Sequence, residues 1–170
     1  GYEGRKLKTG DKIKIGKCCA EPDMTKTAEK CDYPDHIKVR AVLGPQDDMF
    51  TDTDIKFFSK QIYTVTPDLD RMGIRLSGIA LRGRDGMDII SDGITFGSIQ
   101  IARSGMPIIL MADHQTTGGY AKIATVISVD LPKLAQARPY DKVMFDLVSV
   151  KQAEKAAKKE KNYFRKLAGR

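Results

Sequence analysis

The chain contains no tryptophan, only two histidines and only three cysteines among its 170 residues. The histidines, His36 and His114, lie far apart, which argues against a complete hydrolytic site built from this chain alone. The cysteines are odd in number, with Cys18 and Cys19 adjacent and Cys31 alone. This pattern fits neither a disulfide framework nor a zinc-finger spacing. We therefore expect free thiols in a reducing cytoplasm and no bound metal.

Long hydrophobic runs are also missing, since no stretch approaches the roughly 20 apolar residues that a membrane span requires. The chain opens on Gly1 rather than methionine and shows no signal-peptide pattern, so we expect a processed product or a fragment. An apolar fraction of 41% in regularly spaced runs argues against disorder. A chain of this length is expected to form one domain with its own core.

Positive charge is concentrated at one end of the chain. The net charge is +7, but residues 151–170 carry eight lysines and arginines against Glu154 and Glu160, so that +6 lies there and +1 in residues 1–150. We therefore expect no nucleic-acid partner. We interpret the basic segment as a solvated helix face rather than as a phosphate-binding tail. Its apolar residues, Ala153 to Leu167, share one side of a helix, which predicts docking on the folded body or on a partner.

Alternating apolar residues and turn signals predict a mainly β chain. A helix with a Thr/Asp cap is expected over 52–60, a helical turn with Asp130 as its cap, and a loop or linker over 17–36. The predicted strands cover residues 11–15, 37–43, 61–66, 74–81, 94–102, 107–112, 123–129 and 142–150. Such a series of short strands predicts a closed or nearly closed β-barrel over 1–150, with short helices, followed by an amphipathic, basic helical tail over 151–170.

The segment Ala112-Asp113-His114-Gln115-Thr116-Thr117-Gly118-Gly119-Tyr120 is the first candidate site. It connects two apolar stretches, and it is longer and more polar than a hairpin turn requires. Asp113 or His114 can act as a general acid or base. Gln115, Thr116, Thr117, Gly118 and Gly119 can offer hydrogen bonds to a bound substrate or anion. The chain has no phosphate-loop pattern, no serine nucleophile elbow and no His-x-x-x-His pair, so it carries no self-contained catalytic machinery.

A second candidate cluster is Asp70-Arg71-Met72-Gly73-Ile74-Arg75. Arg71 and Arg75 lie four residues apart and can hold a carboxylate or phosphate. Alternatively, Asp70 and Arg71 pair with each other and brace a turn. Ser91 and Gln100 are further candidates for hydrogen bonding to a polar ligand, although the stripe containing Gln100 equally fits plain solvent exposure.

Several motifs together resemble one protein family, called KipA, allophanate hydrolase subunit 2 or the 5-oxoprolinase C subunit, which is similar to biotin-dependent carboxyltransferases. The resemblance covers about residues 1–147. Its segments are Tyr2-Glu3-Gly4-Arg5, Gly10-Asp11, Leu43-Gly44-Pro45-Gln46, Val65-Thr66-Pro67, Asp70 to Gly73 with Arg75-Leu76, Ser91 to Ile94, Gly97 to Gln100, Gly105 to Ile108, Ala112 to Tyr120, Ile123 to Ile127, and Asp130-Leu131 through Gln136. Pro139-Tyr140-Asp141 departs from the family's Pro-Gly-Asp, and Ala121 replaces a common proline.

The resemblance implies the C-terminal half of a family member and a cyclophilin-like β-barrel. It also implies an incomplete subunit of an ATP-dependent hydrolase that opens 5-oxoproline to glutamate with a KipI-like subunit and a LamB/YcsF-like subunit. Asp70, Arg71 and Arg75 would then hold the substrate carboxylate or a phosphorylated intermediate, and the loop from Asp113 to Gly119 would complete the pocket. Two alternatives remain open. One is carboxyl transfer to urea or a related amide with biotin, and the other is a non-catalytic module that binds a KipI-like kinase inhibitor.

Overall fold

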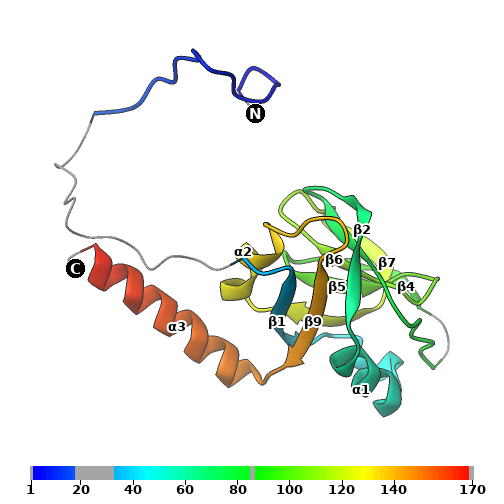
Figure 1. Cartoon of the computed structure of the whole chain (residues 1–170). Coiled ribbons are helices and arrows are strands. Elements are labelled where there is room, and N and C mark those ends of the chain that lie inside the picture. Colours follow the sequence, from blue (N-terminus) through cyan, green and yellow to red (C-terminus); the bar gives the residue numbers. More distant parts are fainter. Residues whose placement is uncertain (1, 18–32, 85–86, 169–170) are drawn as a thin grey trace.

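Among the described residues, seven strands close into a β-barrel, and two more form a small separate sheet (Figure 1). The computed structural model describes residues 2–17, 33–84 and 87–168. The barrel order is β1-β8-β5-β6-β3-β2-β9, and the second sheet pairs β4 with β7. The barrel strands are β1 (His36–Leu43), β2 (Tyr63–Leu69), β3 (Gly73–Ser77), β5 (Ser98–Ile101), β6 (Pro107–Leu110), β8 (Lys122–Val126) and β9 (Lys142–Leu147). The predicted mainly β, closed-barrel fold is confirmed.

The barrel closes through β1 and β9, which run parallel with His36 opposite Lys142 and Ala41 opposite Leu147. The neighbouring strand pairs in the rest of the barrel are antiparallel. Alternate residues of β1 are buried, as the period of two in its sequence predicts. Closure leaves the barrel without an unpaired edge at this seam.

Aromatic side chains fill the barrel end that is covered by α1 (Asp52–Lys60). Phe58 of α1 stacks on Phe145 of β9 at 4.5 Å between ring centroids, and Tyr63 of β2 packs edge-on against Phe145 at 5.5 Å. All three are buried. The helix begins at a capping box in which Thr51 and Asp54 bond reciprocally, which confirms the predicted Thr/Asp cap.

Short helical turns and one long helix complete the chain. They are η1 (Asp47–Met49), η2 (Ser128–Asp130), α2 (Leu131–Leu134) and α3 (Val150–Leu167). The predicted turn after Asp130 exists as α2, but the Asp130 side chain does not cap it. Instead its carboxylate accepts hydrogen bonds from Arg40 at 2.8 and 2.9 Å. The capping expectation was wrong because a charged guanidinium partner outweighs a local backbone N–H.

Two predicted strands need correction, and two observed strands were not predicted. Residues 11–15 form no strand, because this stretch has no pairing partner in the part of the chain that the structure describes. The strand expected over 94–102 shortens to β5, since Gly97 has a φ of +89° and a turn precedes Ser98. β4 (Asp88–Gly93) and β7 (Thr117–Tyr120) were not predicted. The expected linker over 17–36 and the three cysteines lie largely or wholly outside the described residues.

The C-terminal helix α3 confirms the predicted amphipathic helix and runs away from the barrel (Figure 1). Ser149 and Gln152 form a capping box at its start, and none of its described side chains is buried. Docking of its apolar side stays a prediction, as does the division into a barrel domain over 1–150 and a tail over 151–170. No described helix has the length and apolar character needed to cross a membrane.

Candidate functional site

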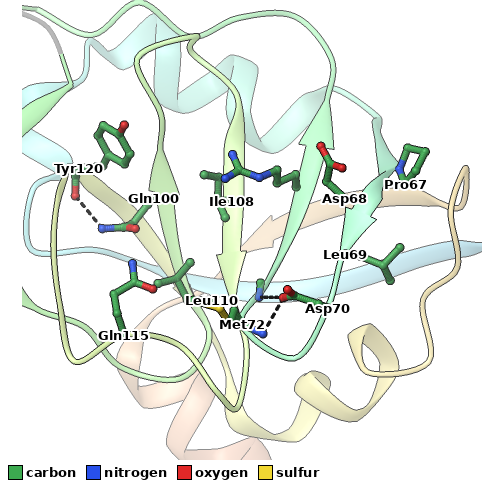
Figure 2. Close-up of a pocket in the computed structure, with 12 residues that line it drawn as sticks. Pro67, Asp68, Leu69, Asp70, Met72, Gln100, Ile108, Leu110, Gln115 and Tyr120 are labelled. Atoms are coloured by element: carbon green, nitrogen blue, oxygen red, sulfur yellow. Dashed lines mark hydrogen bonds between the residues drawn. The ribbon is translucent and has the colours of Figure 1, made fainter.

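A cavity of about 470 Å³ opens between the β2–β3 turn and the segment that leads into β8 (Figure 2). Its floor contains Ile108 and Leu110 of β6. Polar side chains surround this apolar patch, a combination that is typical of sites for small polar ligands. The polar lining residues are Asp68, Asp70, Arg75, Gln100, Gln115 and Tyr120.

The structure brings four of the predicted site residues together in this cavity: Asp70, Arg75, Gln100 and Gln115. The other predicted residues do not line it. These are Arg71, Ser91, Asp113, His114, Thr116, Thr117, Gly118 and Gly119.

Arg75 is a cationic residue of the cavity wall. It lies on β3 opposite Ile108 of β6, and its side chain is exposed. Among the described residues, its guanidinium has no hydrogen-bond or ion-pair partner. A guanidinium without a protein partner is suited to bind a carboxylate with two parallel hydrogen bonds. Arg75 is therefore the best-placed anion-binding group of the cavity.

Gln100 presents an amide group to the same cavity from β5. Its side chain is almost fully buried, and its Nε2 donates to the backbone oxygen of Tyr120 at 3.2 Å. Its Oε1 has no hydrogen-bond partner within the described part of the chain. An amide oxygen without a protein partner can accept a hydrogen bond from a ligand N–H. Figure 2 shows Gln100, Gln115 and Tyr120 grouped on one side of the cavity.

Asp70 has a structural role in the β2–β3 turn. Its Oδ1 accepts hydrogen bonds from the backbone N–H groups of Met72 at 2.7 Å and Gly73 at 3.0 Å (Figure 2). Asp70 does not pair with Arg71, which pairs with Asp113 instead. Asp70 braces the turn through the backbone alone, and that turn brings Asp70 and Met72 to the cavity rim.

Arg71 pairs with Asp113 outside the cavity. Nε of Arg71 donates to Oδ2 of Asp113, and the terminal nitrogen Nη2 donates to Oδ1 at 2.8 Å. The backbone N–H of Asp113 also donates to the carbonyl of Arg71 at 2.7 Å. The hydrogen bond from Arg71 lowers the pKa of Asp113 below its usual value. Asp113 is thus held ionised in an exposed pair that fastens the 112–115 segment to the β2–β3 turn.

His114 is directed toward its own segment. Its Nδ1 lies 2.7 Å from the carbonyl oxygen of Gln115. Thr117, Gly118 and Gly119 belong to β7, which pairs with β4, so that Thr117 lies opposite Gly93 and Gly118 opposite Asp92. Ser91 is exposed on β4. The polar segment is therefore half turn and half strand, whereas the sequence predicts a free loop. Its roles as acid, base and anion binder stay predictions.

Sequence reasoning missed Asp68 of the cavity lining and the buried Lys122 beside it. It included Tyr120 in the first candidate segment but gave this residue no role. Lys122 lies between the buried residues Ala121 and Ile123, and a lysine inside an apolar run was the available signal. Within the described ranges, no group of three or more histidine, cysteine, aspartate or glutamate side chains is arranged to hold a metal ion.

Comparisons with known proteins agree with this architecture. The family described as the carboxyltransferase domain, subdomain A and B, matches residues 1–147. The chain is 36% identical over 163 residues to the 5-oxoprolinase C subunit of Haemophilus influenzae, covering 96% of this chain and 52% of that protein. It is 34% identical over 170 residues to the 5-oxoprolinase C subunit of Escherichia coli K12, covering 100% and 54%. The chain thus spans about half the length of these curated relatives.

The crystal structure of urea carboxylase from Kluyveromyces lactis superposes with a TM-score of 0.75. The match has 21% identity and covers 81% of this chain and 13% of that one, so it supports the fold alone. The family match extends over all strands of the barrel, and both 5-oxoprolinase sequences align along nearly the whole chain. The chain therefore belongs to the family of carboxyltransferase domains, subdomains A and B.

Proposed function

We propose that this chain is the C-terminal domain of the C subunit of a 5-oxoprolinase-type enzyme and that its cavity binds the carboxylate and ring amide of 5-oxoproline. One observation carries the proposal. Arg75, whose guanidinium has no partner among the described residues, and Gln100, whose amide oxygen has none there, line the same cavity in a chain about 35% identical to two 5-oxoprolinase C subunits.

The substrate's groups match the cavity's groups. Arg75 donates to the substrate carboxylate, and Oε1 of Gln100 accepts from the lactam N–H. Gln115 and Tyr120 supply further hydrogen-bonding groups on the same wall. Ile108 and Leu110 contact the ring methylenes. Each of these groups binds or orients the substrate.

The reaction needs more than the cavity contains. Ring opening adds water to the lactam carbonyl carbon, breaks the ring C–N bond and leaves an amino group, with ATP hydrolysed to ADP and phosphate. No serine, cysteine, histidine or lysine is among the described residues that line the cavity. We therefore propose that ATP use and the hydrolytic groups come from a KipI-like subunit and a LamB/YcsF-like subunit in a cytoplasmic complex.

The test is ATP hydrolysis by the full-length protein reassembled with its partner subunits, with and without 5-oxoproline. Stimulation by 5-oxoproline supports the proposal. A complex that shows no stimulation contradicts it. Biotin-dependent carboxyl transfer would instead require activity only with a biotin carrier and carboxylase, and a regulatory module would form a stable complex with a KipI-like partner without turnover.

Arg75→Ala sharpens this test. Loss of a charge-assisted, two-bond contact to a carboxylate is expected to raise KM for 5-oxoproline by about tenfold to a hundredfold. Arg103→Ala is the matched control, because Arg103 is an exposed arginine whose partner Asp88 lies outside the cavity lining. Equal KM values for wild type and Arg75→Ala would remove Arg75 from the binding site.

A further inference from the structure

The buried lysine beside the cavity is a group that the proposed chemistry does not use. Lys122 is the first residue of β8, and its side chain is only 3% exposed. Its Nζ donates to Oδ2 of Asp92 at 2.6 Å and to the carbonyl oxygen of Gly93 at 2.9 Å. A buried ammonium group is strongly unfavourable without such partners. Lys122 therefore fixes the end of β4 against the barrel.

Gln46 completes this arrangement from the loop after β1. Its Nε2 donates to Oδ2 of Asp92 at 3.1 Å, and its Oε1 accepts from the backbone N–H of Lys122 at 3.2 Å. The loop itself lies directly on β8, since the N–H of Gly44 donates to the carbonyl oxygen of Ile123 at 2.8 Å. We call Gln46, Asp92 and Lys122 the Lys122 network.

The network is linked to the cavity through β7. Asp92 of β4 lies opposite Gly118 of β7, and a Cβ added to Gly118 would lie 2.8 Å from Nε2 of Gln100. The same Nε2 donates to the backbone of Tyr120 at the end of β7. A two-stranded sheet is marginally stable alone, so the position of the β4–β7 sheet depends on its attachments to the barrel.

We propose that the Lys122 network positions the β4–β7 sheet so that Gln100, Gln115 and Tyr120 form one wall of the substrate cavity. The network residues do not line the cavity and act through this wall, so they are positioning residues. The identity of the substrate in this inference rests on the proposed function. The link between the Lys122 network and the cavity wall does not rest on the proposed function.

The kinetic test uses the assembled complex with Asp92→Asn and, separately, Lys122→Met. Each change removes the ion pair while keeping the size of the side chain similar. We expect KM for 5-oxoproline to rise by about tenfold with a smaller change in kcat, because the affected wall binds substrate. Asp88→Asn is the matched control. Asp88 lies on the same strand with a 52% exposed side chain, against 51% for Asp92, but its partner Arg103 is 77% exposed.

A double variant separates positioning from simple stabilisation. Replacing both partners, as in Lys122→Met with Asp92→Asn, leaves no unpaired buried charge, so the Tm is expected to recover toward that of the wild type. The attachment of β4 is still missing, so KM is expected to stay raised. A KM that returns to the wild-type value together with the Tm would show a purely structural role and overturn the inference.

Hydrogen–deuterium exchange distinguishes failure of this inference from failure of the proposed function. Asp92→Asn is expected to speed amide exchange in residues 88–93 and 117–120 and to leave α1 unchanged. If wild type responds to 5-oxoproline but the KM values of the single variants do not change, the inference fails and the function stands. If wild type shows no response, the function fails, and the exchange result alone decides: faster exchange in β7 supports the network, and unchanged exchange overturns it.

Discussion

Asp130 is almost completely buried, yet its carboxylate is held ionised by two cations. Arg40 binds it with two side-chain nitrogens, and Lys133 lies 3.0 Å from Oδ1. Burial alone would raise the pKa of Asp130, but the hydrogen bonds from Arg40 and Lys133 together outweigh it and keep the pKa below its usual value. The folded state therefore favours the ionised form, and this carboxylate stabilises the fold at neutral pH.

Asp130→Asn is expected to lower the free energy of unfolding at pH 7 by about 3 kcal/mol, because the cluster loses the anion that both cations bind. The wild-type contribution is present above the unfolded pKa of about 3.9 and is lost as pH falls through the lower folded pKa. The difference between variant and wild type should therefore shrink in acid. Urea denaturation at pH 7 and at about pH 3 measures it.

Asp146→Asn is the control for that comparison, because Asp146 pairs with Lys38 in an exposed salt bridge on the same barrel. Its effect is expected to stay below about 1 kcal/mol at either pH. A difference for Asp130→Asn that is constant across the pH range would contradict the assignment of an ionised Asp130.

The sequence could predict which residue types are able to bind a ligand, but not which of their side chains face the cavity. The sequence indicates that Arg71 and Arg75 are both able to bind an anion, and only the structure separates them. Arg71 meets Asp113 across 42 positions of sequence, whereas Arg75 faces the cavity because β3 pairs with β6 in one particular register. Register depends on contacts between distant strands, and the local pattern around each arginine contains no information about it.

At the scale of elements, local sequence patterns predicted the helices and strands whose formation depends mainly on neighbouring residues. β1 alternates and α1 carries its own cap, so both were found close to their observed bounds. β4 and β7 were missed because the aspartates of β4 and the glycines of both strands are residue types depleted in strands, and these two strands form through pairing with each other. The converse error occurred at 11–15, where an alternating pattern has no partner strand among the described residues.

The loop between β1 and η1 gives a test of element packing. A Cβ added to Gly44 would lie 2.2 Å from the carbonyl oxygen of Lys122, which is backbone and cannot turn away. Gly44→Ala is therefore expected to destabilise the barrel by about 1–3 kcal/mol. Thermal denaturation measures the loss.

Gly16→Ala is the matched control, since an added Cβ there meets no atom within 4 Å and Gly16 has no unusual φ. Its Tm is expected to equal that of the wild type. A Gly44→Ala protein as stable as Gly16→Ala would mean that the loop does not lie on β8 as described.

For the whole molecule, the proposed division of labour predicts that this chain alone has no activity. The cavity can bind a substrate, but its described lining includes no serine, cysteine, histidine or lysine, and the chain corresponds to about half of each curated relative. Glutamate formation from 5-oxoproline and ATP is expected from the reassembled complex and not from the 170-residue chain. Turnover by the chain alone would show that the site is complete without other subunits.

The parallel seam between β1 and β9 also has a consequence for biosynthesis. Strand β1 is made first, but His36 cannot meet Lys142 until more than a hundred further residues have been translated. The barrel therefore cannot close on the ribosome before β9 emerges. Its first strand has no partner on either edge until β8 emerges, and one edge stays unpaired until β9 follows. Such non-local pairing makes folding slow. This order of synthesis therefore favours the binding of chaperones to nascent chains that end before β9.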